Sequence, residues 1–529
     1  MSIEREHDAI VIGSGHNGLI LANYLAKAGM DVVVLEKRLE AGGGLTTEEV
    51  TLPGFYHNLH SLFHDAVEVM PAMKDLKLEE EHHVRYVLPP VQVGMPLMDG
   101  RALTVHVDAE KTRQSLMRIN KADAEKYFQV QTDYREFMEA IALPGLYSTP
   151  PLPSHQMMAL EGTPEGLDYM RLSRSTPEDV ARDWFQDEAV RAATLFQLAI
   201  PRGILTDYAG LGMVLPLVIT QVEPSRLCVG GSHALAHGLW RALLKNGGVT
   251  CGMHEVEEIL IENGKATGVR LTDGQVIKAR KLVASGLGFR QTVLKLMDKT
   301  KIPAPLHQAG ENFKLDEYSL FAVHVALNEP PNYTASKFDP DLNRALKVNL
   351  GFETVADFQR TWSEIRRGII PTKPAMYVST PSMHDPSQAP AGKYTALLWQ
   401  PVPYQPAGKS PEAWDHLKEE FADQCMATWK QYAPNMDSKN IIKRFIQTPI
   451  DIERKISNME RGGVFLGRTT LDQIEYFRPH PLVSQYRSPV GGLYFCGGCM
   501  HPGGGILGAA ARNAADAIAE DFGLTRWWS

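Results

Sequence analysis

Cysteines, long apolar runs and blocks of basic residues are scarce or missing in this sequence, and each absence excludes a class of protein. Five cysteines among 529 residues are too few for a disulfide framework, which fits a reducing compartment. No apolar run is long enough to span a membrane. The 54 lysines and arginines are outnumbered by 62 aspartates and glutamates and form no basic block. We therefore expect no nucleic acid partner.

The charged N-terminal stretch MSIEREHD leads straight into an apolar strand and leaves no room for a signal peptide. We expect a cytoplasmic protein, and peripheral contact with a membrane stays open. Internal repeats and low-complexity tracts are also absent. A hydrophobic content of 44% over this length predicts two or three domain-sized units with real cores.

The first 36 residues contain a dinucleotide-binding unit. A short apolar strand runs into Gly13, Gly15 and Gly18 at GxGxxG spacing, a helix follows, and a second strand ends in Glu36. Gly13 permits the tight turn, Gly15 lets the backbone approach a pyrophosphate, and Gly18 lets the helix pack closely on the strand. The helix N-terminus favours the anion, and Glu36 is placed to accept from ribose hydroxyls. One dinucleotide is therefore expected here.

A second glycine-rich helix start lies near the C-terminus. Residues 491–498 form a strand that enters glycines, and Gly503, Gly505 and Gly508 repeat the GxGxxG spacing before a helix over 509–520. No strand ending in an acid follows, so a second nucleotide unit, and with it a separate NAD(P)H domain, is not expected.

Between these ends the pattern changes twice. Helices are expected over 107–142 and 177–199, and residues 249–285 predict three strands with a turn at Asp273-Gly274. From about residue 318, alternating strands at 321–327, 375–379 and 394–399 predict an antiparallel sheet with one face covered. This second unit is the expected substrate side.

Three strings give the chain a family resemblance: VIGSGHNGLILANYLAKAG, AGGGLTTEEVTLPGF and LYFCGGCMHPGGGILGAAARNAADAI. They resemble the phytoene desaturase and carotenoid isomerase flavoproteins, in particular the branch called pyridine nucleotide-disulfide oxidoreductase domain-containing protein 2. The block Thr448–Arg454 is also similar to that branch, so the resemblance covers nearly the whole length.

The resemblance implies an α/β fold in which a Rossmann-type FAD-binding domain with a parallel sheet carries a discontinuous α+β substrate domain built on an antiparallel sheet. The FAD-binding domain would comprise residues 1–105, 226–300 and 486–529. The substrate domain would comprise a helical segment, 106–225, and the sheet-containing segment 301–485.

FAD is the implied cofactor, bound by residues from both ends of the chain. The first glycine loop would hold the pyrophosphate, Glu36 the ribose, Val256 the adenine side, and the C-terminal glycines would close over the isoalloxazine ring. The implicated residues are Gly13, Ser14, Gly15, His16, Asn17, Gly18, Glu36, Lys37, Gly43, Gly44, Leu45, Thr46, Val256, Gly497, Gly498, Pro502, Gly503, Gly504, Gly505 and Ile506.

One departure concerns the glycine turn after the ribose acid. Many relatives carry Gly-Gly-Arg there, whereas this chain has Gly42-Gly43-Gly44 followed by Leu45. An arginine contact to phosphate or flavin is therefore missing, which weakens the inference that this chain catalyses the desaturase reaction of those relatives.

The candidates for proton transfer are histidines. His57 and His60 follow the glycine turn that should border the flavin, and His501 lies beside the C-terminal glycines, where shaping the turn is the competing role. No cysteine or carboxylate set accompanies these histidines, so no metal site is expected. Cys496 and Cys499 form a CxxC, but small residues packed at a flavin-covering turn explain that spacing better than a redox disulfide.

The resulting hypothesis is an FAD-dependent oxidoreductase of the dehydrogenase or desaturase type that takes a hydride from a hydrophobic or alicyclic substrate. A flavin-dependent amine oxidase and a double-bond isomerase remain alternatives. A non-catalytic lipid-binding chaperone like the Rab GDP-dissociation inhibitor, a distant relative of this fold, is a further one, although it predicts eroded flavin motifs. The electron acceptor, oxygen or a quinone, and a homodimeric state stay open.

Overall fold

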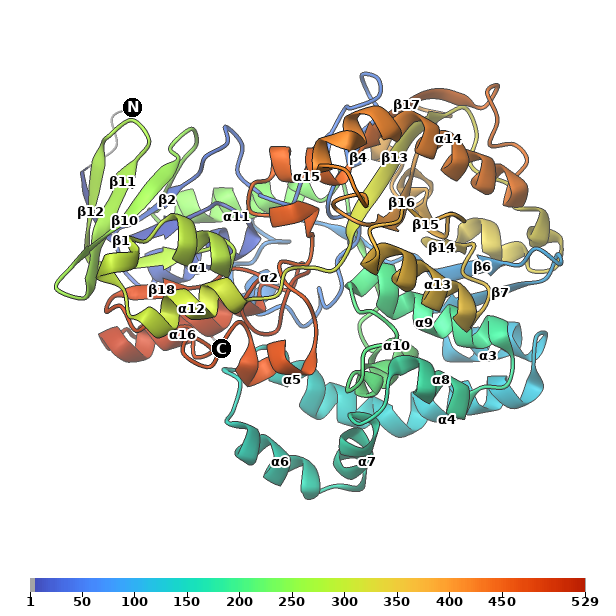
Figure 1. Cartoon of the computed structure of the whole chain (residues 1–529), viewed down its shortest axis with the longest axis horizontal. Coiled ribbons are helices and arrows are strands. Elements are labelled where there is room, and N and C mark those ends of the chain that lie inside the picture. The colour runs from blue at the N-terminus through green and yellow to red at the C-terminus, as the bar shows by residue number, and fades with distance from the viewer. Residues whose placement is uncertain (1–4, 529) are drawn as a thin grey trace.

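A computed structural model of the chain describes residues 5–528 and contains two seven-stranded sheets with helices packed around them. In Figure 1 the first sheet lies on the left, the second on the upper right, and a group of helices fills the lower right. Segments from both ends of the chain meet in the first sheet, so its assembly requires long-range contacts.

The first sheet has a parallel centre and an antiparallel edge. β1 pairs in parallel with β2 and β12, β9 adds to β2, and β18 adds to β12, while β10 and β11 form an antiparallel extension. Its strands are β1 (Glu6–Ile12), β2 (Val32–Leu35), β9 (Val249–Cys251), β10 (Val256–Glu262), β11 (Lys265–Leu271), β12 (Val276–Ser285) and β18 (Leu493–Phe495).

Three helices pack together beside this sheet: α1 (His16–Lys27), α11 (His233–Lys245) and α16 (Ala509–Phe522). Nearly all residues of α1 are buried, because small residues such as Gly18 and Ala22 let it lie close to β1. Beyond the helix, Gly29 has φ +91°, a conformation that glycine adopts without strain. Gly29 therefore ends α1 and lets the chain turn toward β2.

The second sheet is antiparallel except where β14 meets β6. Its order is β17-β13-β16-β15-β14-β6-β7. The strands are β6 (Val91–Pro96), β7 (Ala102–His106), β13 (Ser319–Leu327), β14 (Lys347–Leu350), β15 (Met376–Ser379), β16 (Tyr394–Val402) and β17 (Ile441–Gln447).

Both faces of this second sheet are covered, which corrects the expectation of one covered face. Every residue of β13 is buried, and alternate side chains enter two separate apolar clusters. Trp414 and Phe421 of α14 (Trp414–Tyr432) pack with Phe321 on one side. Phe196 of α9 (Glu188–Arg202) and neighbouring helices cover the other. The apolar run in β13 suits a strand buried on both sides.

The remaining elements complete the layers (Figure 1). The helices are α2 (Pro71–Asp75), α3 (Ala109–Met117), α4 (Lys121–Phe137), α5 (Leu143–Leu146), α6 (Pro153–Glu161), α7 (Pro164–Leu172), α8 (Pro177–Trp184), α10 (Leu215–Thr220), α12 (Ala304–Asn312), α13 (Val355–Arg366) and α15 (Pro449–Lys455). The short strands are β3 (Thr47–Glu48), β4 (His57–Asn58), β5 (Tyr86–Val87) and β8 (Leu227–Cys228).

The predicted helices over 107–142 and 177–199 are each divided. Asn120 caps the start of α4 after α3 has ended, and Asp187 caps the start of α9. Residues 249–285 form four strands, β9 to β12, where three were predicted, and the predicted strands at 321–327, 375–379 and 394–399 are present. Strands β6 and β7 of segment 1–105 belong to the second sheet, and the predicted domain division stays a prediction.

Within residues 5–528, the helices are too short or too polar to cross a membrane.

Candidate active site

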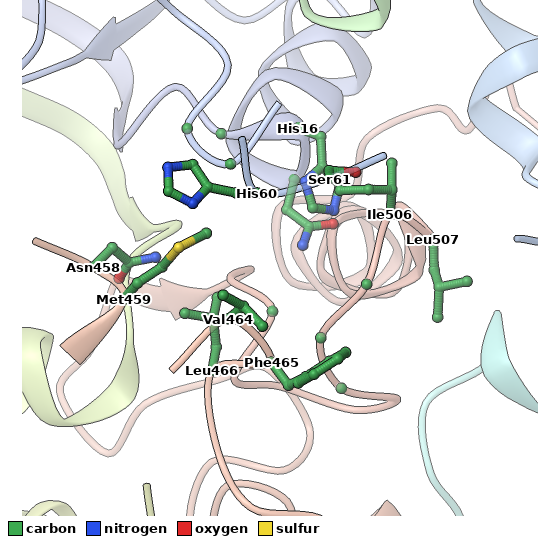
Figure 2. A pocket seen from close by; sticks show the side chains of 18 of the residues that line it. His16, His60, Ser61, Asn458, Met459, Val464, Phe465, Leu466, Ile506 and Leu507 are labelled. Carbon is green, nitrogen blue, oxygen red and sulfur yellow. The ribbon is translucent and has the colours of Figure 1, made fainter. Parts of the chain in front are cut away.

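A cavity of about 510 Å³ lies where the two sheets and the helical group meet. One part of its wall comes from the loop after β1, the end of β2, the 254–256 segment and the C-terminal glycines. The other part comes from β13, β16, α9, α7 and the segment 454–466. Figure 2 shows His60 and Met459 extending into the same space, with Val464, Phe465 and Leu466 on a neighbouring wall.

The first glycine loop forms a cradle without side chains. A Cβ at Gly18 would lie 2.0 Å from the Gly13 carbonyl oxygen, so only glycine allows this approach of helix to strand. A Cβ at Gly15 would meet no protein atom within 4 Å, although Gly15 lines the cavity. Since α1 begins at His16 with no acid in its first turn, its free N–H groups favour an anion there.

Glu36 is held at the end of β2 by hydrogen bonds that fix its carboxylate. Ser14 donates to Glu36 Oε2 from its backbone N–H at 2.9 Å and from its hydroxyl at 2.7 Å. The Arg38 N–H donates to Oε1 at 2.9 Å. Glu36 and Val256 both line the same end of the cavity, where the Lys37 and Glu255 side chains pair at 2.8 Å. This end of the cavity therefore offers a fixed carboxylate beside an apolar side chain.

The C-terminal glycines form the opposite wall. Gly503 and Gly505 have φ values of +127° and +107°, which side chains rarely adopt. A Cβ at Gly504 would lie 2.3 Å from the Phe465 carbonyl oxygen. Arg478 is completely buried behind this wall and donates to carbonyl groups of the 465–468 loop and of Gly498. The guanidinium therefore holds the loop and the glycine wall together.

Several buried polar atoms that line the cavity have no protein partner. They are Nε2 of His16, Oδ1 of Asn17, both ring nitrogens of His60, Oε1 of Gln291 and Nδ1 of His501. Burial lowers the pKa of His60 to about 3 and those of His16 and His501 to about 4, so these rings are neutral near neutral pH. Unpartnered buried polar groups are costly, and a polar cofactor would supply their partners. This set of buried hydrogen-bond donors and acceptors therefore fits a polar cofactor such as FAD.

Four implicated residues support the cavity without lining it. Ser14 holds Glu36, and the Thr46 hydroxyl donates to the Gly43 carbonyl at 2.9 Å. Leu45 is buried in the apolar cluster of the first sheet. A Cβ at Gly497 would lie 2.6 Å from the Leu287 carbonyl oxygen. The other implicated residues line the cavity: Gly13, Gly15, His16, Asn17, Gly18, Glu36, Lys37, Gly43, Gly44, Val256, Gly498, Pro502, Gly503, Gly504, Gly505 and Ile506.

The three candidate histidines lie in different surroundings. His60 and His501 line the cavity, and His501 Nε2 donates to the Gly145 carbonyl at 3.1 Å. His57 does not line it, because its Nε2 bonds to the Thr51 hydroxyl at 2.8 Å and its ring packs against His324. The fold thus brings two of the three to the cavity. In residues 5–528 no group of His, Cys, Asp and Glu is arranged as a metal site.

The cysteines of the CxxC are buried free thiols. Cys496 and Cys499 donate to the carbonyl oxygens of Ser285 and Leu287, each at 3.5 Å. Burial raises the pKa of both thiols, that of Cys499 to about 11. Both are therefore protonated near neutral pH and act in packing at the turn.

Sequence reasoning missed most of the apolar wall and the charges set in it. Asp65, Arg202 and Glu223 line the cavity, and so do Met138, Ile200, Met213 and Leu217. Trp399, an aromatic residue that the sequence places on a predicted strand, lines it from β16, and its ring stacks on that of Tyr377 with centroids 5.2 Å apart. The other residues lie on helices and loops whose periodicity predicts a core, so no local signal distinguishes a cavity wall.

Comparison with known proteins places the chain in a family of flavin enzymes. The family described as flavin containing amine oxidoreductase matches residues 18–519. A limonene dehydrogenase from Castellaniella defragrans has one chain that is 32% identical, with 100% of this chain and 97% of that protein covered.

Two further relatives match the chain over nearly its whole length. Pyridine nucleotide-disulfide oxidoreductase domain-containing protein 2 of Rattus norvegicus is 28% identical, with coverage of 98% and 94%. A lycopene-forming phytoene desaturase of Pseudescherichia vulneris is 26% identical, with coverage of 97% and 99%.

Solved structures support the fold. Wild-type putrescine oxidase bound to putrescine has a TM-score of 0.62 at 15% identity, with 98% of this chain and 99% of that chain covered. Cyclohexylamine oxidase from Brevibacterium oxydans has a TM-score of 0.58 at 14% identity, with the same coverage.

Proposed function

Because this chain belongs to the family of flavin-containing amine oxidoreductases, we propose that it takes a hydride from a C–H bond of a hydrophobic or alicyclic substrate. It is an FAD-dependent oxidoreductase of the dehydrogenase or desaturase type. One observation carries the substrate class: a mainly apolar cavity is continuous with the glycine-lined cradle. Relatives named for limonene and phytoene, both hydrocarbons, support it.

The chain's own groups divide the work of binding. We propose that the N–H groups at the start of α1 bind the pyrophosphate, that Glu36 accepts from the adenosine ribose, and that Val256 borders the adenine. The glycines at 503–505 would lie against the isoalloxazine ring, where bound FAD supplies a two-electron acceptor for the hydride. The neighbouring apolar wall would exclude water and orient the substrate C–H bond.

For proton transfer we propose His60. It lines the cavity, is neutral near neutral pH, and has two ring nitrogens without a protein partner. A neutral imidazole can accept the proton that leaves a desaturated substrate. His501 already donates to a backbone carbonyl and remains the second choice, and His57 would have to act from outside the cavity lining.

Anaerobic spectroscopy of the purified protein tests this proposal. FAD-loaded protein mixed with a cyclic monoterpene should lose its oxidised flavin absorbance. Loss with amines alone would favour an amine oxidase, and conversion only after prior reduction would favour an isomerase. A protein that takes up no FAD would favour the non-catalytic alternative. Reoxidation of the reduced protein by air or by an anaerobic quinone then identifies the acceptor.

We also propose a cytoplasmic location, which the five free cysteines support. A homodimer and peripheral contact with membranes remain proposals. Sedimentation of the FAD-loaded protein, alone and with lipid vesicles, tests both.

A further inference from the structure

Four polar side chains form an ionic cluster at the wall of the apolar part of the cavity. Arg202 Nη2 lies 3.0 Å from Asp65 Oδ2, and the Ser225 hydroxyl donates to Asp65 Oδ1. Lys347 Nζ donates to the Ser225 oxygen at 2.7 Å. The four residues come from the loop after β4, the end of α9, the segment before β8, and β14, so only the fold brings them together.

Two members of the cluster are accessible from the cavity, and two are behind them. Asp65 and Arg202 line the cavity, and 19% of each side chain is accessible. Ser225 and Lys347 are buried and do not line it. Lys347 Nζ lies 4.8 Å from the ring centroid of Phe63, which does line the cavity. The buried pair therefore holds the accessible pair in place.

The carboxylate of Asp65 stays ionised in these surroundings. Burial works to raise the pKa of Asp65, but Arg202, Lys347 and the Ser225 hydroxyl outweigh it and leave the pKa below its usual value. The cavity thus contains a carboxylate beside a guanidinium, in a wall that otherwise includes Phe63, Met213 and Leu217.

The cluster lies close to the wall formed by the C-terminal glycines. Gly203, the residue after Arg202, approaches Phe465 so closely that a Cβ would be 2.3 Å from its ring. Phe465 in turn approaches Gly504. Phe465 therefore lies between the backbone that follows Arg202 and the wall formed by the C-terminal glycines.

Burying an ion pair costs desolvation free energy, and a protein in which apolar residues replace the pair is often equally stable. A pair kept at the wall of a cavity therefore suggests a role in binding. We propose that Asp65 and Arg202 bind a hydroxyl group of the substrate, which is then an alicyclic or isoprenoid alcohol. The hydroxyl would donate to the Asp65 carboxylate and accept from the Arg202 guanidinium, and the apolar wall would enclose the hydrocarbon skeleton. This deepens the proposed function and rests on it.

Other substrate groups fit the cluster less well. A carboxylate would pair with Arg202 but lie beside the ionised carboxylate of Asp65, which also lines the cavity. An ammonium group would pair with Asp65 but face Arg202. A plain hydrocarbon would cover both charges and offer neither of them a hydrogen bond. A hydroxyl alone both donates and accepts at one atom.

Binding of a matched ligand series tests the proposal without turnover. The probes are a p-menthadiene hydrocarbon, the corresponding primary alcohol and the corresponding acid, added to FAD-loaded protein and followed by equilibrium dialysis. The alcohol should bind about tenfold to a hundredfold more tightly than the hydrocarbon and more tightly than the acid. Equal binding of alcohol and hydrocarbon would overturn the proposal.

Two variants and a control assign the effect. Arg202→Met and Asp65→Asn should each remove the preference for the alcohol, with FAD content and unfolding midpoint measured as checks on folding. Glu475→Gln, which removes another cavity-lining charge, should keep the preference. A preference that survives Arg202→Met would also overturn the proposal.

If either variant fails to fold, the proposal is still tested by comparing how tightly the unmodified protein binds the alcohol, the hydrocarbon and the acid. Failure of the proposed function is distinguishable from failure of this inference. If the proposed function is wrong, no ligand reduces the flavin, but the relative affinities of the alcohol, the hydrocarbon and the acid can still be measured.

Discussion

His57 and His324 pack edge to face inside the protein, with ring centroids 5.5 Å apart and an interplanar angle of 78°. Both are buried, and neither ring nitrogen of His324 has a partner. Burial lowers the pKa of His57 to about 4 and that of His324 well below its usual value, and the neighbouring histidines lower the latter further. The pair therefore packs as neutral rings.

This pairing predicts acid sensitivity. Because an unfolded histidine binds a proton near pH 6.5 and the folded pair does not, the free energy of unfolding should fall as the pH drops below 6.5. The loss should reach about 1.4 kcal/mol per pH unit for each such histidine and should continue for His57 to about pH 4. Urea unfolding of FAD-loaded protein at several pH values measures the slope. His324→Leu should make it shallower, and an unchanged slope would contradict this.

Gly15→Ala and Gly18→Ala should separate cofactor binding from folding. An alanine Cβ at residue 18 would overlap the Gly13 carbonyl oxygen, so Gly18→Ala should destabilise the apoprotein as well as weaken FAD binding. At residue 15 the Cβ meets only open space and φ is −61°, so Gly15→Ala should leave the apoprotein stable and weaken FAD binding at least about tenfold. Apoprotein unfolding midpoints and FAD titrations measure the two effects. Tight FAD binding by Gly15→Ala would place the pyrophosphate elsewhere.

Glu36→Ala should weaken FAD retention by about tenfold to a hundredfold, because hydrogen bonds from ribose to a fixed carboxylate would be lost. The matched control is Ser14→Ala, which removes one of the hydrogen bonds that orient Glu36 but keeps the carboxylate. Its effect on FAD dissociation should be smaller. Equal retention by Glu36→Ala and the unmodified protein would argue against the ribose contact.

Lys347→Met should change how stability depends on alkaline pH. Burial lowers the pKa of Lys347 to about 7, although Asp65 opposes the shift, whereas an unfolded lysine titrates near 10.4. Between these values the unfolded chain binds the extra proton, so the free energy of unfolding should rise with pH in the unmodified protein. Unfolding midpoints between about pH 7 and 10 should show this rise, which Lys347→Met should reduce. Parallel curves for the two proteins would show that Lys347 keeps an ordinary pKa.

The cradle could be predicted from sequence because its parts are neighbours along the chain. Gly13, Gly15 and Gly18 act through backbone conformation and close approach, and Glu36 follows one helix and one strand later. The same is true of Gly503 and Gly505, whose positive φ values precede α16. The covering of the second sheet was predicted incorrectly, because β13 was interpreted as an alternating strand, whereas its nearly continuous apolar run reflects burial on both faces, against α14 and α9.

The spacing of glycines, the acid at the end of β2 and the apolar strands determined that this chain binds a dinucleotide and builds a parallel and an antiparallel sheet, because these features depend on local conformation. The tertiary structure decided which residues face the cavity. It placed His60 there and His57 behind, and it brought Asp65, Arg202 and Lys347 together from separate elements. Such contacts depend on how distant segments pack, and no local spacing encodes them.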